Sequence, residues 1–204
     1  MNKTSCVLIT LIIITCSLYG DSNSARPDAV TSASKTIIPI NQRNQTNSKV
    51  LIILATSSQG NTQIISNALQ QTLNADVVSP ENVSIEMLTS YQLIGFGSGI
   101  FDEKHHSTLL SFARNLNQCN QMKVFIFSTS GIAREKLGHN SDPHNALRDI
   151  LIAKGCIVIG EFNCVGLNKN SFLRFFGGMN KNRPNKEDIK TASAFAESLL
   201  NLIN

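Results

Sequence analysis

The residues of this chain that are best suited to bind a ligand form one short polar segment, Ser57-Ser58-Gln59-Gly60-Asn61-Thr62. The segment lies between an apolar run and a stretch of helical spacing. Its backbone N–H groups are therefore expected at a helix N-terminus, where the helix dipole favours an anion. Gly60 permits a tight turn. The segment holds no lysine or arginine, so a phosphate would be bound by neutral donors, unlike in a P-loop. An ordinary capped turn between a strand and a helix is the alternative.

A second segment, residues 95–106, reads GFGSGIFDEKHH. Its glycines recur at every second position, which would let a flat ligand approach the backbone closely. The spacing is not that of the dinucleotide motif G-x-G-x-x-G, and Ser98 lies fourth rather than third, so this is no hydrolase nucleophile elbow. Phe101 is the nearest aromatic residue that could cover a ring, and packing within the protein is its alternative role. His105 and His106 are adjacent and would point apart, so a shared metal ion is not expected.

A third segment, residues 128–140, begins with hydroxyl side chains at the end of an apolar run. No base that sequence can identify accompanies these hydroxyls, so nucleophilic catalysis is weakly supported. His139 and His144 lack a carboxylate or cysteine that would complete a metal site, and we expect both to be solvated loop histidines. The sequence therefore predicts no catalytic residue and no metal site.

The elements that would position these segments alternate along the chain. Short apolar runs, typical of strands buried on both faces, alternate with segments of helical spacing, and this alternation predicts a parallel sheet covered by helices on both sides. The carboxyl ends of parallel strands meet at one edge, so the three segments should come together there. The predicted strands are residues 49–54, 75–78, 92–98, 123–130 and 156–166, and the predicted helices are residues 62–73, 84–91, 106–116, 144–155 and 187–203.

With these segments in view, the chain resembles the flavodoxin family over residues 49–202. The first segment is similar to that family's S/T-x-T-G-x-T phosphate loop, with Gln59 where a threonine is usual. The resemblance implies an α/β fold, a doubly wound, five-stranded parallel sheet in the order 2-1-3-4-5 with helices on both faces. Four further motifs are similar to one bacterial-style branch of flavodoxin-like proteins: GFGSGIF (95–101), KHH (104–106), FIFSTSG (125–131) and FGGMNKNRP (176–184).

The resemblance also implies noncovalently bound FMN. The phosphate would lie on residues 57–62, and the isoalloxazine ring between residues 97–101 and 129–132. The chain has no tryptophan, so Phe101 is the obvious aromatic residue to stack on the ring. The cofactor-binding residues implied in this way are Ser57, Ser58, Gln59, Gly60, Asn61, Thr62, Gly97, Ser98, Gly99, Ile100, Phe101, Thr129, Ser130, Gly131 and Ile132.

The N-terminal residues 1–20 contain one lysine followed by an apolar run. The run is shorter than the ~20 residues that a membrane span needs, and it is typical of a secretory signal peptide. An uncleaved membrane anchor over residues 7–19 is the alternative. Residues 21–48 are polar and predicted to be a flexible linker, and residues 49–204 are the predicted domain. We therefore expect a secreted or extracytoplasmic protein whose only membrane contact is through its N-terminal segment.

Charge and cysteine content limit the partners and the compartment. The net charge of +4 is small, and no basic cluster alternates with aromatic residues, so nucleic acid is not an expected partner. Cys119, Cys156 and Cys164 follow the leader, without metal-like spacing. One disulfide with one free thiol and three buried thiols are both compatible with this pattern.

Three functions are compatible with the sequence. The first is an exported or membrane-tethered FMN protein that carries electrons to a redox partner protein or a quinone. The second is an FMN-dependent oxidoreductase acting on quinones or a porphyrinogen. Residues 164–184 would supply its substrate pocket, with Arg174, Lys181 and Arg183 near an anionic substrate, although a solvated surface is the simpler role for these cations. The third is a flavin-free binding module that keeps only the fold.

Overall fold

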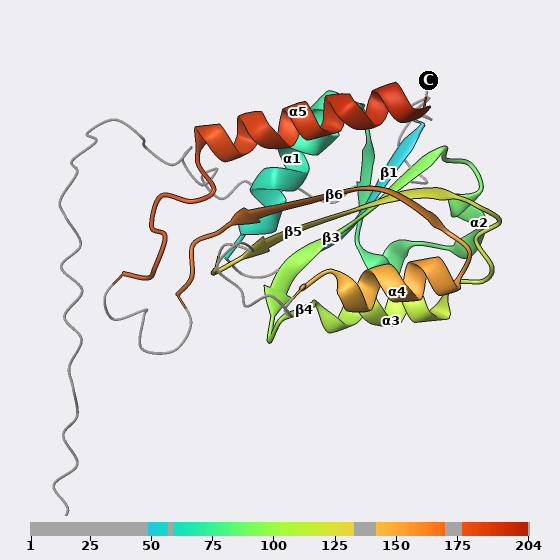
Figure 1. Cartoon of the computed structure of the whole chain (residues 1–204), viewed down its shortest axis with the longest axis horizontal. Coiled ribbons are helices and arrows are strands. Elements are labelled where there is room, and N and C mark those ends of the chain that lie inside the picture. The colour runs from blue at the N-terminus through green and yellow to red at the C-terminus, as the bar shows by residue number, and fades with distance from the viewer. Residues whose placement is uncertain (1–48, 57–58, 133–141, 170–176, 204) are drawn as a thin grey trace, which may run out of the picture.

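The computed structural model describes residues 49–56, 59–132, 142–169 and 177–203, which form a doubly wound parallel sheet (Figure 1). The strand order is β2-β1-β3-β5-β6, and β4 pairs antiparallel with the end of β3. The predicted order 2-1-3-4-5 is confirmed, because β5 and β6 are the fourth and fifth of the predicted strands. The strands are β1 (Val50–Ala55), β2 (Asp76–Val78), β3 (Leu93–Phe101), β4 (Lys104–His105), β5 (Lys123–Ser130) and β6 (Ile157–Val165).

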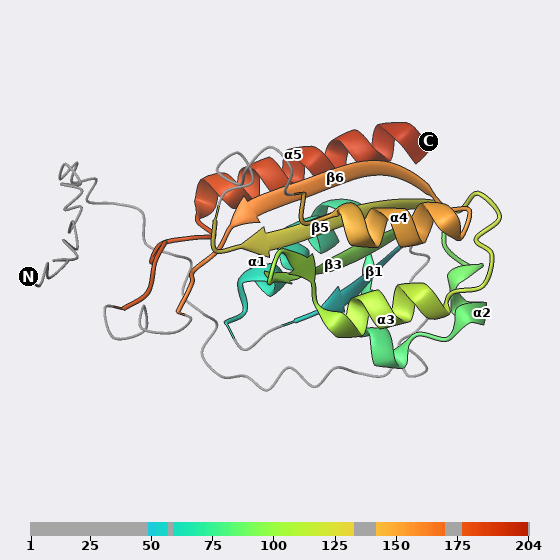
Figure 2. The same cartoon turned by 60° about the horizontal axis from the view of Figure 1, so that its bottom comes forward.

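Helices cover both faces of this sheet (Figure 1, Figure 2). One face packs against α1 and α5, and the other against α2, α3 and α4. The residues of β1 alternate between the two cores, since Ile52 belongs to the first and Ile53 to the second. This is why the run is apolar throughout. The helices are α1 (Asn61–Leu73), the 3₁₀ helix η2 (Pro80–Asn82), α2 (Ile85–Leu88), α3 (Ser107–Asn115), α4 (Asn145–Ala153) and α5 (Lys186–Ile203).

Strand β3 is longer than predicted. The sequence predicts its end at Ser98, but the strand continues to Phe101 and turns back into β4. A Cβ atom on Gly95 would lie 2.3 Å from Cζ of Phe125, and one on Gly97 would lie 2.0 Å from Cζ of Phe127. The protein's own rings therefore fill the space over these two glycines, which accounts for glycine inside a buried strand.

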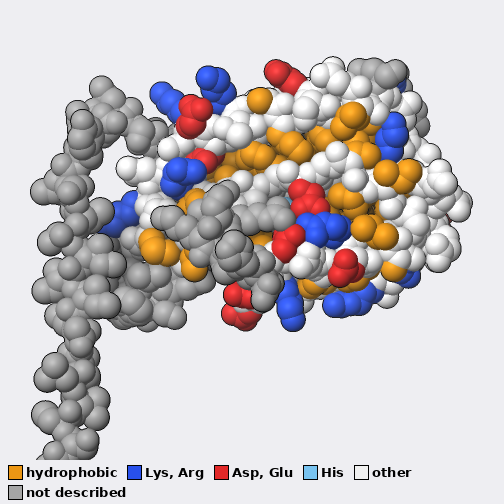
Figure 3. All heavy atoms as spheres, viewed as in Figure 1, with side chains coloured by type: hydrophobic (Ala, Val, Ile, Leu, Met, Phe, Trp, Pro, Cys, Tyr) orange, Lys and Arg blue, Asp and Glu red, His pale blue; other side chains and the backbone are white. Residues whose placement is uncertain are grey.

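Strand β6 forms one edge of the sheet, and apolar side chains gather along it between α5 and α4 (Figure 3). Two of the exposed large apolar side chains are Ile152 of α4 and Ile157 at the start of β6. A β-bulge interrupts the edge, because Val158 pairs with Val124 while Gly160 pairs with Phe125. Bulges of this kind disturb the regular pattern that a further strand would need in order to pair.

The described residues show the state of the cysteines, for which the sequence left two alternatives open. Cys119 and Cys156 form a disulfide with a Cα–Cα distance of 5.1 Å, and Cys164 is a buried free thiol. No helix within the described ranges is long and apolar enough to cross a membrane. The predicted leader and linker, residues 1–48, lie outside those ranges, so these two predictions are not tested.

Candidate functional site

The three polar segments meet at the carboxyl end of the sheet. A shallow depression of about 70 Å³ lies there, beside the start of α1. A larger hollow of about 500 Å³ lies at the opposite end, next to the starts of β3 and β5. We take the smaller one as the site, because doubly wound sheets bind ligands beyond the carboxyl ends of their strands. Its lining residues are Gln59, Asn61, Gly99, Ile100, Phe101, Thr129, Ser130, Gly131, Leu167 and Asn168.

Gly60 is the N-cap residue that precedes helix α1, and it adopts the left-handed conformation with φ 68° and ψ 6°. Gly60 provides no side-chain cap, and a Cβ atom placed on it would meet no atom within 4 Å. The first N–H groups of a helix have no acceptor within the helix, and together with the dipole they attract an anion. The start of α1 thus has the backbone conformation and the open space that a phosphate site requires. Ser57 and Ser58, predicted to complete that site, lie outside the described residues.

The side chains of Asn61 and Thr62 are turned into the protein. Asn61 donates from Nδ2 to the carbonyl oxygen of Leu167 at 2.8 Å and accepts at Oδ1 from the N–H of the same residue at 3.2 Å. The hydroxyl of Thr62 hydrogen bonds to that of Thr129 at 2.8 Å. These contacts fasten the start of α1 to β5 and to the segment after β6, so both residues offer a ligand mainly their backbone.

The ends of β3 and β5 form two walls of the depression. Gly99, Ile100 and Phe101 lie on one side, and Thr129, Ser130 and Gly131 on the other. Phe101 is 40% exposed, and its ring contacts that of His106 edge to face, with centroids 5.7 Å apart. Its ring is therefore partly open to solvent beside the depression, and its role in covering a planar ligand stays a prediction.

The other predicted ring-site residues have different surroundings. Ile132 is 49% exposed and lies just beyond the residues that line the depression. Ser98 is fully buried, and its hydroxyl is bonded to His105 and to the N–H of His106. The side-chain space of Gly97 is filled by Phe127. Of the predicted stretch 97–101, the structure brings only residues 99–101 to the depression.

A further wall comes from the segment after β6, part of the stretch 164–184 that was expected to supply a substrate pocket only if the protein is an oxidoreductase. Leu167 and Asn168 line the depression. Asn180 donates from Nδ2 to the carbonyl oxygens of Gly131 and Gly166, at 2.9 and 3.2 Å, and so holds this segment against the end of β5. In the sequence, the motif FGGMNKNRP, which contains Asn180, marks this segment, but the motif alone does not show which residues the segment contacts.

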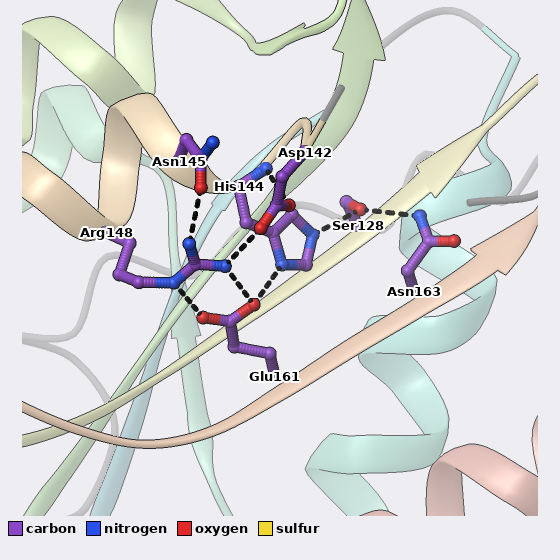
Figure 4. A network of polar contacts seen from close by, with 7 residues as sticks. All are labelled: Ser128, Asp142, His144, Asn145, Arg148, Glu161 and Asn163. Atoms are coloured by element: carbon purple, nitrogen blue, oxygen red, sulfur yellow. Dashed lines mark hydrogen bonds and ion pairs between the residues drawn. The ribbon is translucent and has the colours of Figure 1, made fainter. Parts of the chain in front are cut away.

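Next to the site lies a polar network centred on His144 (Figure 4). The Nε2 atom of His144 is 2.7 Å from the hydroxyl of Ser128, and its Nδ1 atom is 3.0 Å from Oε2 of Glu161. Arg148 hydrogen bonds to both Glu161 and Asp142. The prediction that His144 is a solvated loop histidine is therefore wrong, since the residue is fully buried. Its side-chain partners lie on β5 and β6, which no local pattern could indicate.

Ser128, His144 and Glu161 have the connectivity of a nucleophile, a base and an acid. Ser128 is nevertheless fully buried, so a substrate cannot reach its hydroxyl, and we assign it no catalytic role. Burial would raise the pKa of Glu161, but hydrogen bonds from Arg148 and His144 outweigh it and hold that pKa below its usual range. The hydrogen bond to Glu161 in turn raises the pKa of the Arg148 guanidinium.

Asp142, His144 and Glu161 also present ligand-type atoms within 4.8 Å of one another. The Arg148 guanidinium already lies against both carboxylates, with Nε and Nη2 on Glu161 and Nη2 on Asp142 at 2.7 Å. A cation is thus supplied by the chain itself, and we interpret this cluster as an ion-paired network that holds the start of α4.

The strand order and the position of the site define a flavodoxin-like α/β protein. A family model described as a flavodoxin domain matches residues 52–154. An uncharacterised protein of Methanocaldococcus jannaschii is 41% identical over 152 residues, which cover 74% of this chain and 98% of that relative. The chain belongs to the flavodoxin family.

Solved structures share the fold. Oxidised flavodoxin 2 from Bacillus cereus has a TM-score of 0.53 at 19% identity, covering 76% of this chain and 99% of that one. A short-chain flavodoxin associated with a bacterial microcompartment has a TM-score of 0.55 at 14% identity, covering 76% and 99%. At these identities the likeness is one of fold.

Proposed function

We propose that this protein binds FMN and transfers electrons. Proteins of the flavodoxin family typically bind FMN. The observation that carries the proposal is the open, glycine-capped start of α1 next to a depression between the ends of β3 and β5. Phosphate and ring would each find a matching environment, the first at backbone donors and the second between two stretches of backbone beside Phe101.

The residues around the depression would bind and orient the cofactor. The start of α1 would hold the phosphate through neutral donors, because no lysine or arginine occurs in residues 57–62. Residues 99–101 and 129–131 would border the ring, and Phe101 would cover it. Bound FMN supplies the capacity to accept and release electrons, and the protein contributes position and electrostatics.

An electron carrier is favoured over an enzyme by the character of the lining. Among the described residues that line the depression, none has a titratable side chain. General acid–base catalysis needs such a group within hydrogen-bond reach of the substrate. Carrying electrons to a redox partner protein or a quinone needs no such group.

We further propose that the domain works outside the cytoplasm, after export through the N-terminal segment or while tethered by it. The apolar run in residues 1–20 motivates this proposal. The Cys119–Cys156 disulfide supports it, since disulfides persist mainly in oxidising compartments. Sequencing the N-terminus of protein isolated from its host tests it, and a cytosolic protein that retains Met1 would contradict it.

Flavin titration of the apo-protein tests the central proposal. The fluorescence of FMN should be quenched on binding, and the complex should be yellow. Riboflavin, which lacks the phosphate, should bind far more weakly. Gly60→Val should weaken FMN binding and leave riboflavin binding nearly unchanged. Equal affinity for the two flavins would remove the start of α1 as the phosphate site, and failure to bind either would favour a flavin-free module.

A further inference from the structure

Ser98, near the end of β3, makes three hydrogen bonds beneath the depression. Its hydroxyl donates to the carbonyl oxygen of Gly99 at 2.9 Å and accepts from the N–H of His106 at 3.0 Å. The hydroxyl has one proton, so the Nδ1 atom of His105, 2.8 Å away, must be the donor in that contact. His105 Nε2 is then a bare acceptor, buried and without a partner.

Ser128, near the end of β5, is bonded in a similar way. It accepts from Nδ2 of Asn163 at 2.9 Å and contacts Nε2 of His144 at 2.7 Å. With the Nδ1–H of His144 donating to Glu161, the Ser128 hydroxyl donates its proton to Nε2. Every polar atom of this pair has a partner, and the ion pairs of Arg148 extend the network to the start of α4.

The two pairs occupy equivalent places in the fold. Ser98 and Ser128 are register partners on neighbouring strands, and each lies one residue before a residue that lines the depression, Gly99 or Thr129. Each histidine lies at the start of the next helix, with His105 immediately before the α3 cap and His144 as the α4 cap. The rings of the two histidines are 5.0 Å apart, so the pairs also contact each other.

We propose that the pairs Ser98–His105 and Ser128–His144 are positioning pairs for the flavin ring. Each one lies directly beneath a strand end that forms one wall of the depression, residues 99–101 of β3 or residues 129–131 at the end of β5. By joining the strand end to the start of the following helix, the pairs hold the two walls at a set separation. This proposal rests on the proposed function, since the ligand between the walls is the flavin.

None of these four side chains touches the depression, so they act on a ligand only through the backbone that they hold. That sets their effect apart from the effect of the phosphate site. Loosening a wall should weaken the binding of any isoalloxazine ring, with or without a phosphate. Damage at the start of α1 should instead change the preference for FMN over riboflavin.

The test is flavin titration of Ser98→Ala and Ser128→Ala in the full domain, with Ser66→Ala as the matched control. Ser66 is a fully buried serine of α1 whose hydroxyl has no hydrogen-bond partner. Ser66→Ala therefore removes a buried hydroxyl without breaking a hydrogen bond. Each strand variant should lose about three- to tenfold in affinity, because one buried hydrogen-bonded pair is removed. The loss should be equal for FMN and riboflavin, and Ser66→Ala should bind both as the wild type does.

Hydrogen exchange of the apo-proteins provides a readout that needs no flavin. Ser98→Ala should speed the exchange of residues 99–101, and Ser128→Ala that of residues 129–132, with β1 unchanged in both. Unchanged exchange at the walls would overturn the positioning role whatever the flavin does. So would unchanged affinities, or a loss confined to FMN. If the wild type binds no flavin, the proposed function fails, and the exchange result alone decides whether the pairs hold the walls.

Discussion

Strands β3 and β5 are neighbours, and the end of each forms one wall of the depression, but their side chains differ. Glycines of β3 face phenylalanines of β5 at Gly95–Phe125 and at Gly97–Phe127, so one strand supplies the space and the other fills it. On the opposite face of the sheet, the register pair Phe96–Ile126 is followed by Ser98–Ser128, where the two strands are alike and both turn a hydroxyl toward a histidine. Near the candidate site, one face of these strands therefore has interlocked packing and the other has paired polar contacts.

The histidines themselves are stabilised differently. His105 lies on the short strand β4, and burial, with a smaller contribution from His144, lowers its pKa to about 3. His144 is joined to a carboxylate and through it to the Arg148 guanidinium. One wall of the site is therefore held by a neutral pair that is shielded from water, and the other by an ion-paired network. The two should respond differently to mutation and to pH.

The interlock of the two strands should give the largest effect. Gly97→Ala places a methyl group 2.0 Å from Cζ of Phe127, whose ring is fully buried. We expect the free energy of unfolding to fall by about 3 kcal/mol, as for severe overpacking. Urea unfolding measures it. Adding Phe127→Leu should recover at least about 1 kcal/mol of the free energy of unfolding. If the losses of the two single variants simply add in the double variant, the two residues are not interlocked.

Loss of the cation in the His144 network should come next. Arg148→Leu leaves Glu161, whose side chain is 18% exposed, without its guanidinium. Breaking a fully buried pair costs about 3–5 kcal/mol, and partial exposure should reduce this to about 2 kcal/mol. Asp149→Asn, an exposed change on the same helix, is the control and should stay within about 0.5 kcal/mol. Faster hydrogen exchange should be confined to residues 129–132, and equal loosening of 99–101 would contradict separate roles for the two pairs.

Mild acid should affect the neutral pair first. The folded pKa of His105, about 3, lies below the unfolded value near 6.5, so the unfolded chain binds more protons between these values and stability falls as the pH is lowered. The titratable groups that influence His105 are His144, Glu161 and Asp142. Between pH 6.5 and 5 the wild type should lose about 1–2 kcal/mol more than His105→Asn does. If the wild type and His105→Asn show the same pH dependence in urea unfolding, His105 is not a buried, neutral histidine.

The Glu161 carboxylate has a lowered pKa and acts in a lower pH range. Its contribution is complete above the unfolded value of about 4.5 and is lost as the pH falls further. Glu161→Gln should therefore change the slope of stability against pH below about 4.5 and leave the slope between pH 6.5 and 5 as in the wild type.

The smallest effect concerns which ring nitrogen meets the serine. His105 uses Nδ1 and His144 uses Nε2, and the amide of asparagine can replace Nδ1 while that of the longer glutamine replaces Nε2. At position 105, asparagine should be better tolerated than glutamine by about 1 kcal/mol, the net value of one hydrogen bond. At position 144 the order should reverse. The same order at both positions in thermal melts would show that side-chain size, not the bonded atom, decides.

Much of the fold could be predicted from the sequence, because the pattern of apolar residues is local. The run of β1 and the helical spacing of α1 were recognisable, and the structure places both within one or two residues of the prediction. Asn185 caps the start of α5, since its Oδ1 accepts from the N–H groups of Glu187 and Asp188, and an asparagine just before a helical pattern is a local signal of this kind. The gathering of three segments at one edge followed from the parallel sheet.

The site was harder to predict, because residue type indicated polar character but not direction. Asn61 and Thr62 have the composition of a phosphate loop, yet their side chains bond across the fold to Leu167 and Thr129. His144 has no informative neighbour in the sequence, and its carboxylate partner lies 17 residues away on another strand. The segment after β6 lines the depression through contacts that its motif does not encode.

By itself, the sequence determined the order of strands and helices, the faces that they bury and the glycine turn before α1, since each depends on periodicity or on local backbone preference. Only the tertiary structure decided that Phe125 and Phe127 fill the glycine positions of β3 and that two serine–histidine pairs lie under the site. These contacts join residues on different strands and helices. Their energies depend on the distance and burial that the folded chain imposes, and no spacing along a single chain specifies those.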